Sequence, residues 1–198
     1  MKGGRLRPIL LAACLAALVM GTAWLTGADP IAAAQLAARW TARLSFLLFL
    51  PVFVASSLVR LAPTAATRAL LRDRRYWGLG FALAHFVHLG ALITYLGMSG
   101  VPPKLLTLTG GGGGYVILLA MVLTSNDGAQ RAMGRWWKRL HRIGMYWLWF
   151  VFAFSYASRI ADPARMSIGL VFAPMAFTAL GLRLAAAIRV RRRRVASA

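Results

Sequence analysis

The sequence predicts an all-α, polytopic membrane protein: a bundle of six transmembrane helices with both termini in the cytoplasm. Of its 198 residues, 60% are hydrophobic and only 14% are charged, whereas a soluble domain carries about 25% charged residues. The apolar residues occur in blocks rather than at the one-face spacing of a surface helix, and basic residues separate the blocks. Such a chain lacks the polar surface that a water-soluble fold needs.

Six apolar blocks are long enough to cross the hydrocarbon core, which takes about 20 residues in a helix. They are residues 8–26, 43–60, 77–97, 105–124, 140–158 and 167–188. The fourth is the weakest, because its strongly apolar part begins only at Tyr115 and it must include the glycine run Gly110–Gly114. Glycine is tolerated in membrane helices, and no Gly-Lys-Ser/Thr follows to make the run a phosphate-binding loop. We expect one domain over residues 1–198, ending in a basic cytoplasmic tail at 189–198.

Lysine and arginine set the expected orientation. Nineteen of them lie on one side of the predicted membrane and five on the other, and the positive-inside rule places the richer side in the cytoplasm. The richer side holds Lys2, Arg5, Arg7, Arg60, Arg68, Arg72, Arg74, Arg75, Arg131, Arg135, Lys138, Arg139, Arg142, Arg183, Arg189 and Arg191–Arg194, and the other side holds Arg39, Arg43, Lys104, Arg159 and Arg165. The basic tail is expected to contact anionic lipid headgroups.

The first block has an alternative interpretation as a cleaved signal peptide. Basic residues precede its apolar core, and small residues follow near Gly27 and Ala28, which is the order that a signal peptide shows. Cleavage would leave five helices and an external N-terminus, and the N-terminal basic cluster would lose its anchoring role. We therefore expect the first helix to be retained.

The positions of the basic residues and the single cysteine disfavour nucleic-acid binding and cysteine-based sites. A net charge of +20 would suit nucleic acid if the basic residues formed one patch, but they are spread between the apolar blocks, so no nucleic-acid partner is expected. Cys14 is the only cysteine, which excludes an intrachain disulfide and a metal site built from cysteines. We expect it to be a small buried apolar side chain.

The three histidines, His85, His88 and His141, lie inside or at the mouth of apolar blocks, where imidazoles are costly and usually functional. His85 and His88 share one helical face at i, i+3 spacing. At about 1.5 Å per residue, His88 lies about 20 Å from the basic cytoplasmic end of the third block. His141 lies near the cytoplasmic start of the fifth block.

Imidazoles from two different helices can hold one haem iron between them. Depth in the membrane does not decide whether His85 or His88 is the iron ligand on the third block. The structural alternative is that each imidazole only hydrogen-bonds a neighbouring helix, a contact worth about 0.6 to 2 kcal/mol. A proton relay is disfavoured, because no Asp or Glu lies deep in the apolar blocks.

Residues from Gly27 almost to the C-terminus carry a resemblance to a known family. They are Gly27, Ala28, Asp29 and Pro30 after the first block; Arg74, Arg75, Gly78 and Leu79 entering the third; His88 ten residues after Gly78; Thr124 and Ser125 closing the fourth; and Gly134, Trp137, Leu140 and His141 opening the fifth. In order and spacing the chain resembles the ferric reductase-like transmembrane domain family. Within that family it most resembles the MsrQ-type (YedZ) haem-binding subunits, which feed electrons to a periplasmic methionine sulfoxide reductase.

The resemblance implies a six-helix bundle in a bacterial inner (plasma) membrane that binds haem b. His88 and His141 match the family's axial ligands for the inner haem, and His85 matches no family ligand. The possible propionate contacts are Arg74, Arg75, Lys138 and Arg142, whose alternative role is topology and lipid contact. An iron held by two histidines has no open position, which suits outer-sphere electron transfer rather than oxygen binding.

One departure from the family pattern concerns a second haem. The family has a further histidine about 13 residues after the first one on the fifth helix, and this chain has Phe154 there. Phenylalanine cannot ligate iron, so the resemblance gives no ligand for a periplasm-side haem about 20 Å farther along the helix.

No Gly-x-Gly-x-x-Gly unit for a flavin or nicotinamide domain follows the sixth block. We therefore expect the electron source, a soluble flavin reductase or a membrane quinol, to be separate. The expected function is a cytochrome b-type relay with one haem, passing electrons from the cytoplasmic side to a partner reductase, rather than a complete enzyme. The alternatives are a cofactor-free membrane transporter or assembly protein that has lost haem binding, and a ferric reductase that works with a flavoprotein.

Overall fold

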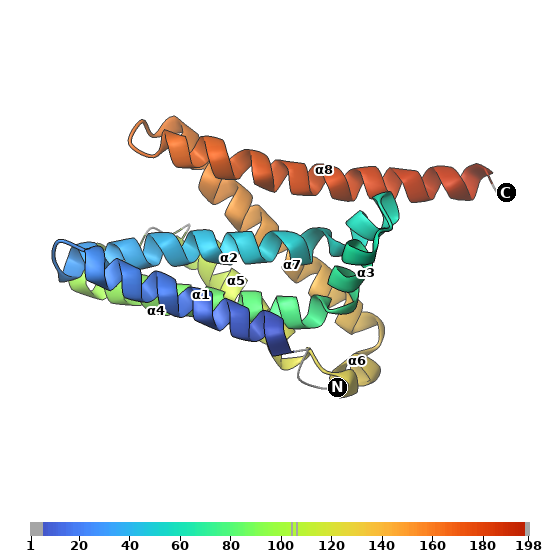
Figure 1. Cartoon of the computed structure of the whole chain (residues 1–198), viewed down its shortest axis with the longest axis horizontal. Helices are drawn as coiled ribbons and strands as arrows, with labels where there is room; N and C mark the ends of the chain where they lie inside the picture. The colour runs from blue at the N-terminus through green and yellow to red at the C-terminus, as the bar shows by residue number, and fades with distance from the viewer. Residues whose placement is uncertain (1–5, 104, 106, 197–198) are drawn as a thin grey trace. The chain divides into compact units, whose positions relative to one another are not determined.

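The computed structural model describes residues 6–103, 105 and 107–196, and all regular secondary structure in this part is helical (Figure 1). The elements are α1 (Arg7–Thr26), α2 (Pro30–Leu61), α3 (Ala65–Arg72), α4 (Arg74–Ser99), the π-helix η2 (Thr107–Gly112), α5 (Gly113–Leu123), α6 (Asp127–Met133), α7 (Arg135–Ala157), the 3₁₀-helix η3 (Ser158–Ala161) and α8 (Met166–Ala196). The predicted all-α class is confirmed. The predicted topology residues Lys2, Arg5 and Lys104 lie outside the described residues.

Four described helices, α1, α2, α4 and α8, are long and apolar enough to cross a bilayer. A fifth candidate span joins Thr107–Leu123 to Asp127–Met133, which are bent by 104° relative to each other. Helix α7 is not among these spans, because basic residues occupy its first turns and its Trp and Tyr residues are only weakly hydrophobic. The chain is thus a multi-pass membrane protein with four to five candidate spans, and the sixth span stays a prediction.

The start of α2 and the end of α8 differ most from the predicted blocks, and α7 begins five residues earlier than predicted, at Arg135. Helix α2 begins at Pro30 rather than near residue 43, because Asp29 Oδ1 accepts the backbone N–H of Ala32 at 2.8 Å and proline suits the first turn of a helix. Helix α8 continues to Ala196, through most of the predicted tail, because arginine is a good helix former. The basic C-terminal segment is therefore a helical extension.

Local capping produces the sharp change of direction after α5. Asn126 Oδ1 accepts the N–H of Ala129 at 2.8 Å and starts α6. Gly134 then ends α6 with a φ of +50°, a conformation that glycine adopts without a Cβ penalty. Trp137 Nε1 donates to the carbonyl of Thr124 at 2.8 Å, which holds the start of α7 against the end of α5.

The described chain divides into two compact units. Unit 1 comprises Met1–Phe49 and Arg75–Leu140. Within it α1, the first part of α2 and α4 lie side by side around a buried cluster of small residues (Figure 1), which is a packing mode typical of membrane helices. The cluster consists of Ala23, Ala37, Ala38 and Ala91. Gly80 of α4 faces α1 closely, because an added Cβ would lie 2.8 Å from the carbonyl oxygen of Pro8.

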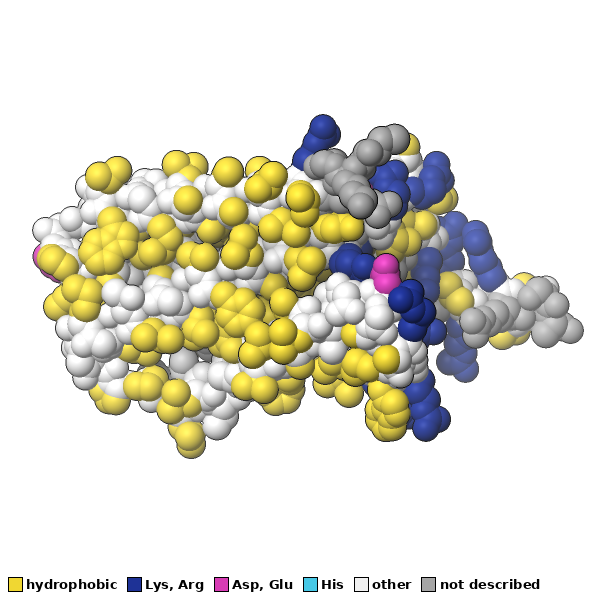
Figure 2. All heavy atoms as spheres, turned by 90° about the horizontal axis from the view of Figure 1, so that it is seen from below, with side chains coloured by type: hydrophobic (Ala, Val, Ile, Leu, Met, Phe, Trp, Pro, Cys, Tyr) yellow, Lys and Arg dark blue, Asp and Glu magenta, His cyan; other side chains and the backbone are white. Residues whose placement is uncertain are grey.

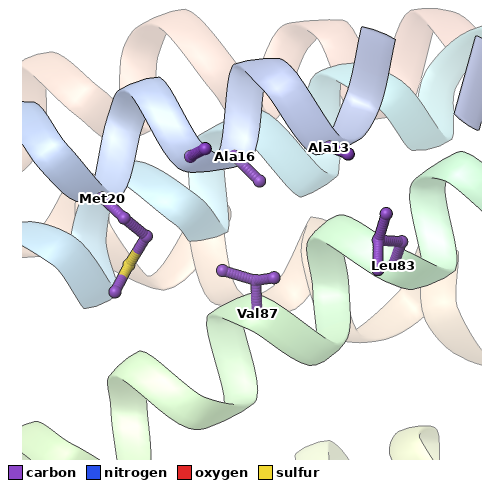
Figure 3. Close-up of a pocket in the computed structure, with 6 residues that line it drawn as sticks. Ala13, Ala16, Met20, Leu83 and Val87 are labelled. Atoms are coloured by element: carbon purple, nitrogen blue, oxygen red, sulfur yellow. The ribbon is translucent and has the colours of Figure 1, made fainter. Parts of the chain in front are cut away.

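A shallow apolar groove of about 190 Å³ runs between α1 and α4 of unit 1 (Figure 3). Its lining residues are Ala13, Ala16, Ala17, Met20, Leu83 and Val87. These side chains carry no polar group, so the groove offers a ligand only hydrophobic contact.

Unit 2 comprises Leu50–Arg74 and His141–Ala198. Aromatic side chains join α7 to α8 in this unit: Trp149 Nε1 donates to the carbonyl of Ala176 at 2.9 Å, and Tyr156 stacks on Phe172 at 4.8 Å between ring centroids. Phe53 of α2 lies 6.4 Å from Trp149 in a stacked arrangement. The second part of α2, α7 and α8 therefore pack through rings rather than through small residues.

Large hydrophobic side chains are spread over the outer surfaces of the helices, as Figure 2 shows for one face. Leu18 is 66% exposed, Leu25 88% and Val116 70%. Apolar surface of this extent is unfavourable in water and is consistent with contact to lipid. Cys14 is also exposed on α1, so the expectation that it is buried is wrong: its small apolar side chain faces outward.

Candidate functional site

The two histidines of the third predicted block lie on α4 in unit 1, one turn apart. Their ring centroids are 5.6 Å apart, as the i, i+3 spacing predicts. His85 is buried, with 7% of its surface exposed, whereas His88 is half-buried. The two imidazoles therefore share a face of the helix but have different surroundings.

His88 is held by a hydroxyl from the neighbouring helix. Its Nδ1 lies 3.2 Å from Oγ1 of Thr41 on α2. The same hydroxyl donates to the carbonyl oxygen of Ala37 at 2.6 Å, so its proton is already engaged and it accepts from the imidazole. We assign the proton of His88 to Nδ1 on this basis, so Nε2 is the unprotonated nitrogen of the neutral ring, the type of atom that ligates metal ions.

His85 occupies an aromatic stack instead. It lies 4.6 Å from the ring of Tyr115 on α5 and 5.4 Å from Phe81 on its own helix. Phe81 in turn lies 5.3 Å from Phe49 on α2. These contacts explain why a polar ring is retained in the interior of unit 1, and they favour a packing role for His85.

His141 lies on α7 and is the first residue of unit 2 in this part of the chain, where it is half-buried. His88 belongs to unit 1. Each predicted axial ligand is therefore described within its own unit, and their pairing stays a prediction.

The four predicted propionate contacts are divided between the two units, two in each. In unit 1, Arg75 is ion-paired with Asp127, and Lys138 is exposed on the first turn of α7. In unit 2, Arg74 donates through Nε to the carbonyl of Val52 at 2.9 Å, and Arg142 is exposed. Of these four, Arg75 already has an anionic partner, and the two exposed side chains are available to headgroups or to a cofactor.

Thr41 was not predicted as part of the site. Arg39 and Arg43 flank it in the sequence, so the hydropathy pattern put it before the second apolar block. The signal that could have found it is its spacing from Ala37, since a threonine in an apolar helix can bond the carbonyl four residues earlier and so remain fully buried.

Phe154, the residue at the family's second ligand position, is 46% exposed on α7 in unit 2. Its ring lies 6.0 Å from that of Phe150. Among the residues that the structure describes, no group of three or more His, Cys, Asp and Glu side chains could hold a metal ion.

Comparison of the chain with models of protein families, with curated proteins and with solved structures finds no match in any of the three. The resemblance to the ferric reductase-like family accordingly rests on the sequence positions given above.

Proposed function

We propose that the chain is a cytochrome b-type electron-transfer subunit of a bacterial inner membrane, holding one haem b through His88 and His141. The observation that carries this function is the hydrogen bond between Thr41 Oγ1 and His88 Nδ1 at 3.2 Å. Histidines that ligate a metal usually donate their other ring N–H to a fixed acceptor, which orients the ring and raises its basicity.

The residues around His88 suit a low-polarity redox site. Thr41 is fully buried and bonds to its own helix, so it holds the imidazole without bringing water with it. One turn from His88, the rings of Phe81 on α4 and Tyr115 on α5 stack on His85 and add apolar surface. A bound haem supplies reversible one-electron transfer, and two axial imidazoles leave no position for oxygen.

The proposed topology has six spans, with α7 as one of them and both termini in the cytoplasm. Helix α7 has 23 residues, and its segment Ile143–Ala157 contains no charged side chain. Its first turns carry Arg135, Lys138, Arg139 and Arg142, which the positive-inside rule assigns to the cytoplasm. His141 would then face a donor on the cytoplasmic side.

The proposed partners follow from the resemblance and from this orientation. A cytoplasmic flavin reductase or a membrane quinol would supply electrons, and a periplasmic reductase would receive them. Phe154 offers no ligand for a second haem, so delivery across the outer half of the membrane would need a carrier on the partner.

The test is a pyridine haemochrome measurement on protein expressed with added haem. We expect about one haem b per chain, and near-complete loss in His88→Ala and in His141→Ala. His85→Phe is the matched control, because it removes an imidazole but keeps a ring for the stack with Tyr115. Full haem content in either ligand variant would refute the assignment.

A cofactor-free transporter or assembly protein is the second candidate. The exposed Phe154 favours it, because an apolar side chain stands where the related proteins carry a ligand. Protein that folds correctly but purifies colourless from cells with ample haem would overturn the first function and favour the second.

A further inference from the structure

Unit 2 contains a pair of arginines that the electron-transfer function does not use together. Arg183 on α8 donates through Nη1 to the carbonyl of Phe53 at 2.6 Å and through Nε to the hydroxyl of Tyr146 at 3.2 Å. Its guanidinium also lies over the rings of both residues, 4.3 Å and 4.6 Å from their centroids. The side chain is therefore fixed in one orientation by α2 and α7.

Arg74, the first residue of α4, is held by the stretch of α2 that also binds Arg183. Its Nε donates to the carbonyl of Val52 at 2.9 Å, the residue before Phe53. Because Val52 and Phe53 are consecutive residues, these hydrogen bonds hold the two guanidinium groups at neighbouring carbonyls of α2, and both side chains are half-buried. Two like charges held together away from bulk water are unfavourable unless an anion offsets them.

Several guanidinium N–H groups of the two arginines remain as hydrogen-bond donors for such an anion. Nε of Arg74 and both Nε and Nη1 of Arg183 are engaged, so Nη1 and Nη2 of Arg74 and Nη2 of Arg183 remain. Within the described ranges neither guanidinium has a carboxylate partner. The acidic neighbour in the sequence, Asp73, is ion-paired with Arg72. Guanidinium groups are well matched to oxyanions, which they bind through parallel N–H donors.

The position along the helices points to the source of the anion. Arg183 follows Met166, the first residue of α8, by a rise of about 26 Å at 1.5 Å per residue, close to the thickness of a hydrocarbon core of about 30 Å. Arg74 is the first residue of α4, at the end of a candidate span. Tyr146 supplies an amphipathic ring of the kind found at the headgroup level. Both arginines are therefore placed at the depth of phospholipid phosphates.

We propose that Arg74 and Arg183 form a specific binding site for the phosphate group of a membrane phospholipid. The site tethers α2, α7 and α8 of unit 2 to one leaflet. It differs from general attraction to the basic helix end at Arg189–Arg193, because its two guanidinium groups are fixed by backbone carbonyls rather than exposed on a helix surface.

The experiment counts phospholipids that stay bound to the full chain. Wild-type protein is reconstituted in vesicles of phosphatidylethanolamine and phosphatidylglycerol, extracted in mild detergent and measured by native mass spectrometry. We expect one retained phospholipid per chain, and a retained fraction about tenfold lower in Arg74→Gln and in Arg183→Gln, the effect of losing hydrogen bonds to a charged group. Arg131→Gln, which removes one exposed charge from α6, should retain lipid as the wild type does.

Two further arms separate the possible sources of the anion. Arg183→Lys keeps the positive charge but loses the parallel N–H donors of the guanidinium group. This variant should therefore fold and still retain less lipid than the wild type. In delipidated protein, added phospholipid should raise the midpoint of thermal unfolding, whereas inorganic phosphate at the same concentration should not. Equal lipid retention in all variants would overturn the site, as would equal protection by inorganic phosphate. Loss of haem with unchanged lipid retention would assign the pair to a haem propionate instead.

Discussion

Thr41 is the side chain that distinguishes the two histidines of α4. A threonine hydroxyl that bonds to its own helix at Ala37 has its lone pairs free for a second partner, and His88 takes one of them. His85, one turn away, contacts rings instead. Sequence spacing could predict that both imidazoles share a face, but it could not choose between them, because the choice depends on which residue of α2 lies opposite.

Replacing Thr41 by valine tests this role with little change of shape. Thr41→Val keeps the branched side chain and removes the acceptor for His88 Nδ1–H, so the imidazole loses its orientation. Loss of such a partner typically costs about 10- to 100-fold in metal affinity, and we expect a haem affinity lower by that factor, measured by titrating haem into the apoprotein.

Thr41→Ser is the matched control, because serine retains the hydroxyl and should bind haem nearly as the wild type does. Equal haem affinity in Thr41→Val and Thr41→Ser would show that the hydrogen bond has no part in ligation.

Helices α1 and α4 could be predicted from hydropathy almost to their ends, because their apolar blocks are continuous. The start of α2 could not be predicted in this way. Arg39 and Arg43 interrupt the hydropathy pattern, so the apolar block begins only at residue 43, whereas the helix begins at Pro30. There the capping by Asp29 and the close contact of Gly27 with Ala33 fix the boundary. Local turn chemistry, rather than hydropathy, decides where this helix begins.

The stacking of His85 on Tyr115 could not be predicted from the sequence either. Tyr115 follows the run Gly110–Gly114, whose first three glycines end the π-helix Thr107–Gly112 and whose last two begin α5. In a π-helix the hydrogen bonds join residues i and i+5 instead of i and i+4, which shifts the register of the residues that follow. The face of α5 that carries Tyr115 therefore cannot be read from an α-helical period that starts at residue 105.

Close packing of α1 on α4 is tested by adding a single methyl group. In Gly80→Ala the new Cβ would lie 2.8 Å from the carbonyl oxygen of Pro8 and 3.1 Å from Cβ of Ala12. We expect the free energy of unfolding to fall by about 1–3 kcal/mol, as for other overpacked sites, measured by chemical unfolding in detergent.

Gly90→Ala on the same helix is the control, since an added Cβ there meets nothing within 4 Å. Its stability should be unchanged or slightly higher. If both variants were equally stable, the contact between Gly80 and α1 would not exist in the protein.

The proposed topology of the whole chain makes a clear prediction for cysteine labelling. In a Cys14→Ser background, Ala28→Cys and Ala164→Cys place thiols at exposed positions between helices, and a membrane-impermeant reagent should label them from the periplasm. Ala66→Cys and Ala132→Cys are also exposed and should be labelled only after the membrane is opened. A pattern in which Ala132→Cys and Ala164→Cys react from the same side would remove α7 as a span.

Two imidazoles on one iron can be detected by electron paramagnetic resonance of the oxidised, haem-loaded protein. We predict a low-spin ferric signal typical of two histidine ligands in the wild type and in His85→Phe, and its disappearance in His88→Ala and in His141→Ala. A high-spin signal in the wild type, or a low-spin signal that survives both ligand variants, would contradict the assignment of His88 and His141 as the axial pair.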